Sequence, residues 1–234
     1  MTEDAPLGPV VDTRPARRPE RLTLNGRFVT LEPLDPERHA KALYEGSNGD
    51  ARRDSVWTYL GVGPFSNFAD FAADIAAKAR SEDPLFFAVI DNATMRPVGY
   101  QTLMRVDPTN RVIEVGNIMY APALQRTRGA TEAQYLFARY VFEELGNRRY
   151  EWKCNDLNAP SKRAAERLGF VFEGVFRQHM IVKGRSRDTA WFSMLDSEWP
   201  DRKQAFERWL ADENFDASGR QKRRLSDFRG KGPR

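Results

Sequence analysis

The chain of 234 residues contains little cysteine, little histidine and no long hydrophobic run. Its single cysteine, Cys154, excludes an internal disulfide and is typical of a reducing compartment. One cysteine and two histidines, His39 and His179, cannot build a usual zinc site, so we expect no bound metal. No apolar stretch approaches the roughly 20 residues of a membrane-spanning helix, and the N-terminal residues lack the apolar core of a signal peptide. We therefore expect a cytoplasmic protein without a membrane partner.

The net charge of +4 suggests a nucleic-acid partner until the charges are located along the chain. Residues 216–234 carry seven Lys or Arg against two Asp, residues 1–20 carry three Arg against four Asp or Glu, and the segment between them carries 27 of each sign. Because the basicity is confined to the C-terminal tail, we do not expect a folded nucleic-acid-binding groove. Composition predicts that residues 1–20 and 215–234 are disordered. The tail then serves solubility or, alternatively, contacts RNA or an acidic partner.

The segment between these ends, residues 21–214, has the composition of one domain. The whole chain is 41% hydrophobic and 12% aromatic, which is enough to bury a core. Alternating apolar and polar residues predict strands, and apolar residues at helical spacing after a capping residue, such as Asp35 or the Ser66-Asn67 pair, predict helices. The predicted strands are residues 26–34, 85–91, 97–106, 112–120, 148–154, 170–182 and 187–195, and the predicted helices begin near residues 36, 68, 131, 159 and 200. This order of elements predicts a single domain of the α/β (α+β) class.

The stretch LQRTRGATEA, residues 124–133, lies where the helix from Thr131 to Leu145 is expected to begin. The first turn of a helix exposes unpaired N–H groups and a partial positive charge, and both attract anions. Arg126 and Arg128 add two cations at the same point, which favours a phosphate-bearing ligand, while a solvated surface turn is the alternative. We do not expect a nucleoside triphosphate, because the chain has no Gly-Lys-Ser/Thr sequence to hold its phosphates.

Three stretches in this order resemble the GNAT superfamily of N-acyltransferases, and within it the ribosomal-protein N-terminal acetyltransferases of the RimJ/RimL type. They are IEVGNIMYAPALQRTRGATEA (residues 113–133), NAPSKRAAERLGF (158–170) and FEGVFRQHMIVKGRSRDTAWFSML (172–195). The resemblance covers residues 26–196 and implies a GNAT fold, with a mixed, mostly antiparallel twisted sheet of about seven strands flanked by helices. It also implies an enzyme that transfers an acetyl group from acetyl-CoA to an amine without a metal. We expect a monomer or a homodimer.

The resemblance further implies which residues bind coenzyme A. Backbone N–H groups of residues 126–131 would face the pyrophosphate, on the positive end of the helix. The cofactor-binding residues implied in this way are Met119, Tyr120, Gln125, Arg126, Thr127, Arg128, Gly129, Ala130, Thr131 and Asn158. Met119 and Tyr120 would offer backbone groups to the pantetheine arm, and Asn158 would bind that arm, cap its helix, or do both. Arg128 departs from the family, which usually has a glycine there, so either Gly129 supplies the backbone freedom or Arg128 turns its side chain outward.

Two residues are the candidates for catalysis. Acyl transfer to an amine requires that the ammonium be deprotonated and that the departing thiolate be protonated. The resemblance places the general base at Glu114, two residues before Gly116, and the alternative for this residue is a solvent-facing strand glutamate. It also places Ser161 near the thioester sulfur, where the hydroxyl would orient the sulfur or a water, or would only cap its helix.

Other side chains receive expectations from the sequence itself. Trp57 and Tyr59 lie in a long segment between two predicted helices and could wall an acceptor pocket, with packing over the core as the alternative. We expect His39 at the surface and His179 in a structural role. Cys154 is expected to be buried rather than nucleophilic, because aminolysis of a thioester needs no covalent intermediate.

Two alternative functions stay open at this stage. A longer acyl donor such as succinyl-CoA would require a cation near the acyl end, and Arg105 or Arg177 could serve. From a different class, the chain could bind coenzyme A or an interaction partner without catalysis. The sequence does not name the amine acceptor, which could be a protein N-terminus or a small molecule.

Overall fold

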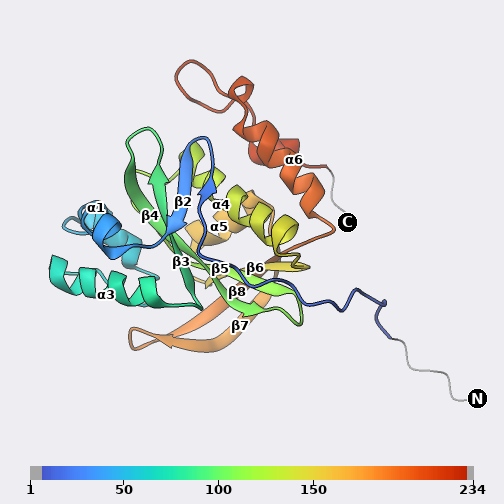
Figure 1. Ribbon diagram of the computed structural model, residues 1–234, viewed down its shortest axis with the longest axis horizontal. Coiled ribbons are helices and arrows are strands. Elements are labelled where there is room, and N and C mark those ends of the chain that lie inside the picture. The colour runs from blue at the N-terminus through green and yellow to red at the C-terminus, as the bar shows by residue number, and fades with distance from the viewer. Residues whose placement is uncertain (1–6, 231–234) are drawn as a thin grey trace, which may run out of the picture.

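The computed structural model describes residues 7–230, which build one eight-stranded sheet with helices on both faces (Figure 1). The strand order across the sheet is β1-β2-β3-β4-β5-β6-β8-β7. The strands are β1 (Leu24–Asn25), β2 (Val29–Pro33), β3 (Leu85–Asp91), β4 (Arg96–Asp107), β5 (Val112–Tyr120), β6 (Arg149–Asn155), β7 (Val171–Val182) and β8 (Arg185–Leu195). Neighbouring strands are antiparallel except for β5 and β6, which are parallel. The predicted mixed, mostly antiparallel sheet is confirmed, with eight strands in place of about seven.

The helices begin where capping side chains satisfy the first backbone N–H groups. Within residues 7–230 they are α1 (Pro36–Ser47), α2 (Ala51–Asp54), α3 (Phe68–Arg80), α4 (Arg128–Arg139), α5 (Ala159–Leu168) and α6 (Trp199–Leu210), with short helical turns at Ser55–Trp57, Asp212–Asn214 and Leu225–Phe228. The predicted caps at Asp35 and Asn67 are confirmed, since both side chains accept hydrogen bonds from the first turn. Helix α4 begins earlier than predicted because Thr127 caps it, and it continues into a π-helical turn, Tyr140–Glu144.

Each face of the sheet has its own hydrophobic core. On the first, which we call the α4 face, side chains such as Phe87 and Trp152 pack beneath α4 and α5. On the opposite α1 face, Tyr100 and Met119 pack beneath α1 and α3, and this cluster includes Trp57. Figure 1 shows α1 and α3 together at one side of the sheet, over β2–β4, which leaves the α1 face of β5–β8 without a helix.

Strands β5 and β6 diverge at their carboxyl ends. Their pairing runs only from Val112 opposite Arg149 to Val115 opposite Trp152. Beyond that point β5 contains a bulge against β4, where Asn117 has a positive φ of 45°. The bulge turns the end of β5 away from β6, so the two strands form a wedge whose backbone groups have no strand partner on the inner side.

The chain termini differ from what composition predicted. Residues 215–230 lie against the domain, where Leu225 is 1% exposed and Arg229 donates to the carbonyl of Glu166 at 3.1 Å. In the N-terminal lead the backbone N–H of Ala16 donates to the carbonyl of Pro108 at 2.9 Å. A few apolar anchors and backbone contacts are enough to hold these segments, although their charge and proline content is typical of disorder. Residues 1–6 and 231–234 lie outside the described residues.

The expectation that His39 is exposed is wrong, since the side chain is 2% exposed. Its Nδ1 accepts a hydrogen bond from the backbone N–H of Asp35 at 3.0 Å, which folds the ring under the start of α1. Among the described residues, no helix is long and apolar enough to cross a membrane.

Candidate active site

The loop between β5 and α4 presents the amino end of α4 to the wedge. Thr127 Oγ1 accepts the N–H of Ala130 at 3.1 Å, and Arg126 adopts a positive φ of 63° just before it. Gly129 packs closely on β2, because a Cβ there would lie 2.7 Å from the Cγ1 of Val29. The sequence therefore places its one loop glycine where α4 approaches the sheet, and the other N–H groups of the first turn have no helical partner.

Arg128 stands where the family usually has glycine, and its side chain turns away from this loop, which is one of the two arrangements expected from the sequence. Its guanidinium lies between two aromatic rings, 4.2 Å from the ring centre of Phe28 and 3.9 Å from that of Phe215. It donates to the carbonyl of Leu210 at 2.5 Å and pairs with Asp212 at 3.0 Å. The side chain is thus held by the C-terminal segment and leaves the loop backbone accessible.

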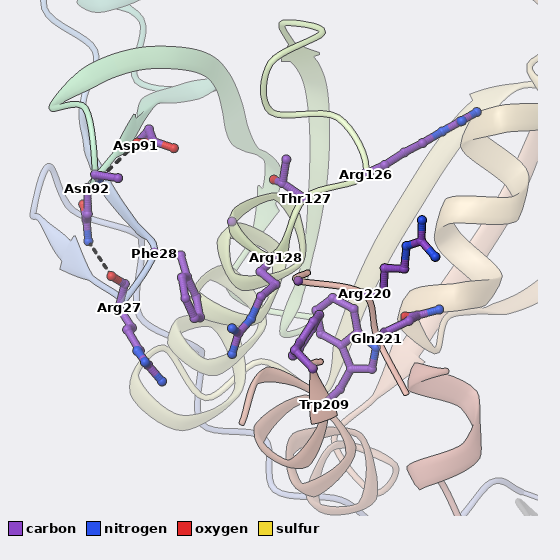
Figure 2. A pocket seen from close by; sticks show the side chains of 14 residues that line it. Arg27, Phe28, Asp91, Asn92, Arg126, Thr127, Arg128, Trp209, Arg220 and Gln221 are labelled. Carbon is purple, nitrogen blue, oxygen red and sulfur yellow. Dashed lines mark hydrogen bonds between the residues drawn. The ribbon is translucent and has the colours of Figure 1, made fainter. Parts of the chain in front are cut away.

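A cavity of about 810 Å³ adjoins the loop (Figure 2). Its walls come from the loop, the turns that flank β2 and β3–β4, and the C-terminal segment, with Arg27, Asn92, Trp209, Arg220 and Gln221 among the lining residues. Figure 2 shows Arg126 pointing away from Arg128, with Arg220 on the same side of the cavity as Arg126. Cationic and aromatic side chains in one cavity suit a ligand that carries both phosphate and a planar ring.

Glu132 fixes one wall of this cavity. Its carboxylate is buried and accepts the backbone N–H groups of Arg27 at 2.9 Å, Phe28 at 2.6 Å and Val29 at 2.9 Å. Three charge-assisted hydrogen bonds tie the β1–β2 turn to the second turn of α4. Sequence reasoning missed this residue, because its partners lie more than 100 positions away.

The remaining residues of the predicted cofactor site lie around the same end of the wedge. Gln125 donates from Nε2 to the carbonyl of Tyr120 at 2.9 Å, and Thr131 Oγ1 accepts from Arg167 at 3.1 Å. The side chain of Met119 is buried on the α1 face, so only its backbone can line the wedge.

Ser161 lies on the opposite wall of the wedge, beside β6. Its Oγ accepts a hydrogen bond from the indole Nε1 of Trp152 at 3.0 Å, and its N–H is capped by Oδ1 of Asn158 at 3.1 Å. The hydroxyl can still donate one hydrogen bond, and the thiol of Cys154 is a partner within its reach. The neighbouring Cys154 is buried as expected, and burial raises the pKa of its thiol, which makes it a poor nucleophile.

Glu114 lies on the α1 face and is 5% exposed. Its carboxylate accepts from Lys153 Nζ at 2.9 Å and pairs with Arg105 Nε at 3.1 Å. Burial raises the pKa of Glu114, and the charges of Lys153 and Arg105 oppose that rise. Gly116, two residues later, lies on the same face, and a side chain is not tolerated there because a Cβ would collide with Met104. The solvent-facing alternative for Glu114 does not describe this carboxylate, which is enclosed by two cations.

A roof covers part of this face, formed by the segment between α2 and α3 and the tip of the β7–β8 hairpin. Lys183 at the hairpin tip donates to the carbonyls of Trp57 at 2.8 Å and Gly63 at 2.7 Å. Tyr59 donates from its hydroxyl to the carbonyl of Leu157 at 3.0 Å, so it reaches across to the loop after β6. Trp57 is 0% exposed and packs in the core, so it supports the roof from behind, whereas Tyr59 lies at its surface.

The arrangement joins two compartments. Ser161 and the loop that precedes α4 border the wedge on the α4 face. Glu114 lies on the α1 face, next to the point where β5 and β6 separate. The sequence brought most of these residues to notice, but it missed Lys153 and the C-terminal residues Arg220 and Gln221. The sequence EWK, residues 151–153, could have indicated this position of Lys153, because alternate residues of a strand share a face and Glu151 and Lys153 therefore lie on the same one.

Comparisons with known proteins agree with this geometry. A family model described as "Acetyltransferase (GNAT) domain" matches residues 29–171. The crystal structure of a GCN5-related N-acetyltransferase from Brucella melitensis is 52% identical, with a TM-score of 0.90 over 92% of this chain and 97% of that chain. A probable GNAT-family acetyltransferase structure from Chromobacterium violaceum is 39% identical, with a TM-score of 0.77 over 86% of this chain and 100% of that chain.

A curated relative from Bacillus subtilis, named "Putative ribosomal N-acetyltransferase YdaF", is 31% identical over 180 residues, which are 74% of this chain and 92% of the relative. The family model spans more than half of the chain, and acetyl-CoA is the typical co-substrate of its members. These matches place the protein in the GNAT acetyltransferase family, in its RimJ/RimL-like branch, and the wedge between β5 and β6 agrees with that assignment.

Proposed function

We propose that this acetyltransferase moves an acetyl group from acetyl-CoA directly to a primary amine, either a protein N-terminus or a small molecule. The observation that carries the proposal is the wedge, which connects an anion-binding helix end on the α4 face with the enclosed carboxylate of Glu114 on the α1 face. The name of the Bacillus subtilis relative, a ribosomal N-acetyltransferase, supports a protein N-terminus among the possible amines.

The donor would bind across the wedge. The pyrophosphate of coenzyme A would accept hydrogen bonds from the N–H groups of residues 126–131, with the side chain of Arg126 adding charge. The pantetheine arm would then pair with backbone groups of β5 beyond Val115, where β6 no longer does so. Asn158 and Ser161 border this path from the other side.

Glu114 would accept a proton from the incoming ammonium, directly or through one water. The freed amine then attacks the thioester carbon, the carbon–sulfur bond breaks, and the thiolate leaves with a proton. Ser161 would turn its hydroxyl proton from the thiol of Cys154 to the sulfur of the thioester, while Trp152 continues to donate to its oxygen. A serine is too weak an acid to supply the proton permanently, so a water would complete the transfer.

A matched pair of variants tests the proposal. Glu114→Gln keeps the shape of the side chain but removes the base, and Glu37→Gln makes the same change at an exposed position in α1. With acetyl-CoA and a panel of amines, release of free thiol at pH 7 should fall by about 10²–10⁴-fold in Glu114→Gln alone. Partial recovery is expected near pH 9–10, where solvent deprotonates the amine.

Calorimetry completes this experiment. Glu114→Gln should bind acetyl-CoA with nearly the wild-type dissociation constant, because the carboxylate lies on the acceptor side. Wild-type turnover in this variant would show that the proton leaves by another route. A protein that binds acetyl-CoA and releases no thiol with any amine would instead be a binding protein, and parallel runs with propionyl- and succinyl-CoA identify the preferred donor.

A further inference from the structure

The uncovered part of the α1 face gathers a cluster of charged and aromatic side chains. Paired residues of neighbouring strands share a face, and Lys153 pairs with Trp191 across β6 and β8. The ammonium of Lys153 lies 3.9 Å from the ring centre of Trp191, and the imidazole of His179 lies 5.9 Å from the same ring. Arg187 is four residues before Trp191 on β8, so the alternation of the strand brings it to this face as well.

Two hydrogen-bond donors of this cluster are left without partners. The Nε of Arg187 and the indole Nε1 of Trp191 are both buried, and no described residue accepts a hydrogen bond from either. Buried donors in native structures are nearly always satisfied, and an unsatisfied one costs free energy. The two donors lie four residues apart on one strand, about 13 Å along it, so they are two separate unfilled positions. The position at the charged Arg187 is the one where an acceptor group from outside the chain would fit best.

The electrostatic surroundings indicate the charge of that group. Burial lowers the pKa of Arg187, whereas Cys154 and Glu114 raise it and Arg105 lowers it. Burial also lowers the pKa of His179, as do the charges of Arg105, Arg187 and Lys153, so cations surround this imidazole and disfavour its protonated form.

The carboxylates near this cluster already have other partners. Glu114 accepts from Lys153 at 2.9 Å and pairs with Arg105, Glu151 pairs with Lys153 at 2.7 Å, and Asp188 accepts the backbone N–H of Gln178 at 2.6 Å. Among residues 7–230, no carboxylate lies within ion-pair distance of Arg187, and Glu114 stabilises its positive charge only from farther away.

The hairpin also provides space. A bulge in β7, where Gln178 has a positive φ of 49°, borders a cavity of about 620 Å³ lined by Phe176, Arg177, Gln178 and His179. The ring of Phe176 lies 4.5 Å from that of Trp191, so the cavity adjoins the cluster, and Arg177 adds another cation to its wall.

We infer that the amine acceptor carries a carboxylate, which Arg187 binds while the ammonium faces Glu114. This inference rests on the proposed function, because it names the class of acceptor for the same site. Arginine binds carboxylates through planar, charge-assisted hydrogen bonds. A molecule with both groups could therefore place its carboxylate at Arg187 and its ammonium at Glu114. An amino acid or a peptide with an acidic residue next to its N-terminus has this chemistry.

Matched acceptors test the inference. Thiol release from acetyl-CoA is measured with Ser-Asp-Ala-amide against Ser-Asn-Ala-amide, and with serine against serinamide, which separates a side-chain carboxylate from an α-carboxylate. In at least one of the two pairs, the wild-type protein should show a kcat/KM at least about tenfold higher for the acceptor with the carboxylate than for its uncharged amide counterpart. Arg187→Met should reduce this ratio to about one, and Arg187→Lys should retain part of it. Arg208→Met removes the same charge from an exposed site on α6 and should keep the wild-type ratio.

Each outcome decides the inference. A wild-type ratio near one in both pairs overturns it and leaves the acetyltransferase proposal intact. An unchanged ratio in Arg187→Met also overturns it. If Arg187→Met instead alters only the choice between succinyl-CoA and acetyl-CoA, the carboxylate belongs to the donor and the inference is wrong. If Arg187→Met does not fold, Arg187→Lys provides the same comparison. Absence of thiol release with every amine, although acetyl-CoA binds, overturns the proposed function and this inference together.

Discussion

Lys153 is the residue whose replacement should reveal most about the state of Glu114. Its side chain is 6% exposed and lies between two carboxylates, at 2.9 Å from Glu114 and 2.7 Å from Glu151. Lys153→Met removes the positive charge and keeps an unbranched apolar chain beside Trp191. The two carboxylates then face each other without the cation between them, and both effects favour the protonated form of Glu114.

The size of the effect follows from the distance. Two unit charges 2.9 Å apart attract each other by roughly 6 kcal/mol at an effective dielectric constant of about 20. Arg105 remains beside Glu114 and water can enter the vacated volume, so much of this energy is compensated. If only about a quarter survives, roughly 1.4 kcal/mol, the protonation equilibrium of Glu114 still changes about tenfold.

The assay compares kcat/KM of Lys153→Met and the wild type at pH 6, 7, 8 and 9 with one amine. The ionisation of the amine affects both proteins equally, so it cancels in their ratio. Protonated Glu114 cannot act as a base, and the protonated form is populated more at low pH. The variant should therefore be slower at the acid end, by at most about tenfold, and the difference should narrow as the pH rises.

Lys203→Met serves as the matched control. Lys203 on α6 also pairs with a glutamate, Glu143, at 2.8 Å, but about a third of its side chain is exposed. An exposed pair contributes little, so this variant should follow the wild type at every pH. If Lys153→Met binds acetyl-CoA normally and its rate stays in constant proportion to the wild type from pH 6 to 9, Lys153 does not govern the proton of Glu114, and the reasoning is refuted.

Three further outcomes are expected. Arg126→Glu should weaken acetyl-CoA binding by more than tenfold in calorimetry, since it sets a carboxylate against the pyrophosphate; an unchanged dissociation constant would remove this side chain from the site. Truncation after Asp216 should lower the unfolding free energy by about 2 kcal/mol, because Leu225 is buried. If the truncated protein unfolded at the same thermal midpoint as the full-length protein, this expectation would be wrong. Burial lowers the pKa of His39, so stability should decline as the pH falls below about 6.5, and urea unfolding of His39→Asn should show a smaller decline.

The order of elements could be predicted from the sequence because local rules determine it. Alternation and turn residues marked the strands, and Asp35 and Asn67 marked helix starts through hydrogen bonds that span only a few residues. The loop before α4 was also recognisable, since its glycine and arginines stand together in the sequence. These features depend on neighbours within one or two turns, and a single sequence contains that information.

The pairings that build the site depend instead on register between distant strands. Glu114 and Lys153 are 39 residues apart and meet only because β5 and β6 pair in parallel with Glu114 opposite Glu151. A shift of one residue would send either side chain to the other face. The burial of Trp57 has a different origin, since it depends on the packing of its ring against Phe71 of α3 and on the hydrogen bond from its indole N–H to the carbonyl of Ser47 at 2.6 Å.

The C-terminal segment shows how a feature of composition can conceal a structural role. Arg128 stands where the family usually has glycine, and a charged side chain at that point would obstruct the loop if it had no other place to lie. Phe215 and Asp212 provide that place, because they complete the aromatic and ionic contacts that hold the guanidinium away from the loop. The same segment continues to Arg220, on the far side of the cavity from Arg128 (Figure 2). The departure from glycine and the docked segment are therefore best understood together, since the segment supplies the contacts that hold the side chain of Arg128.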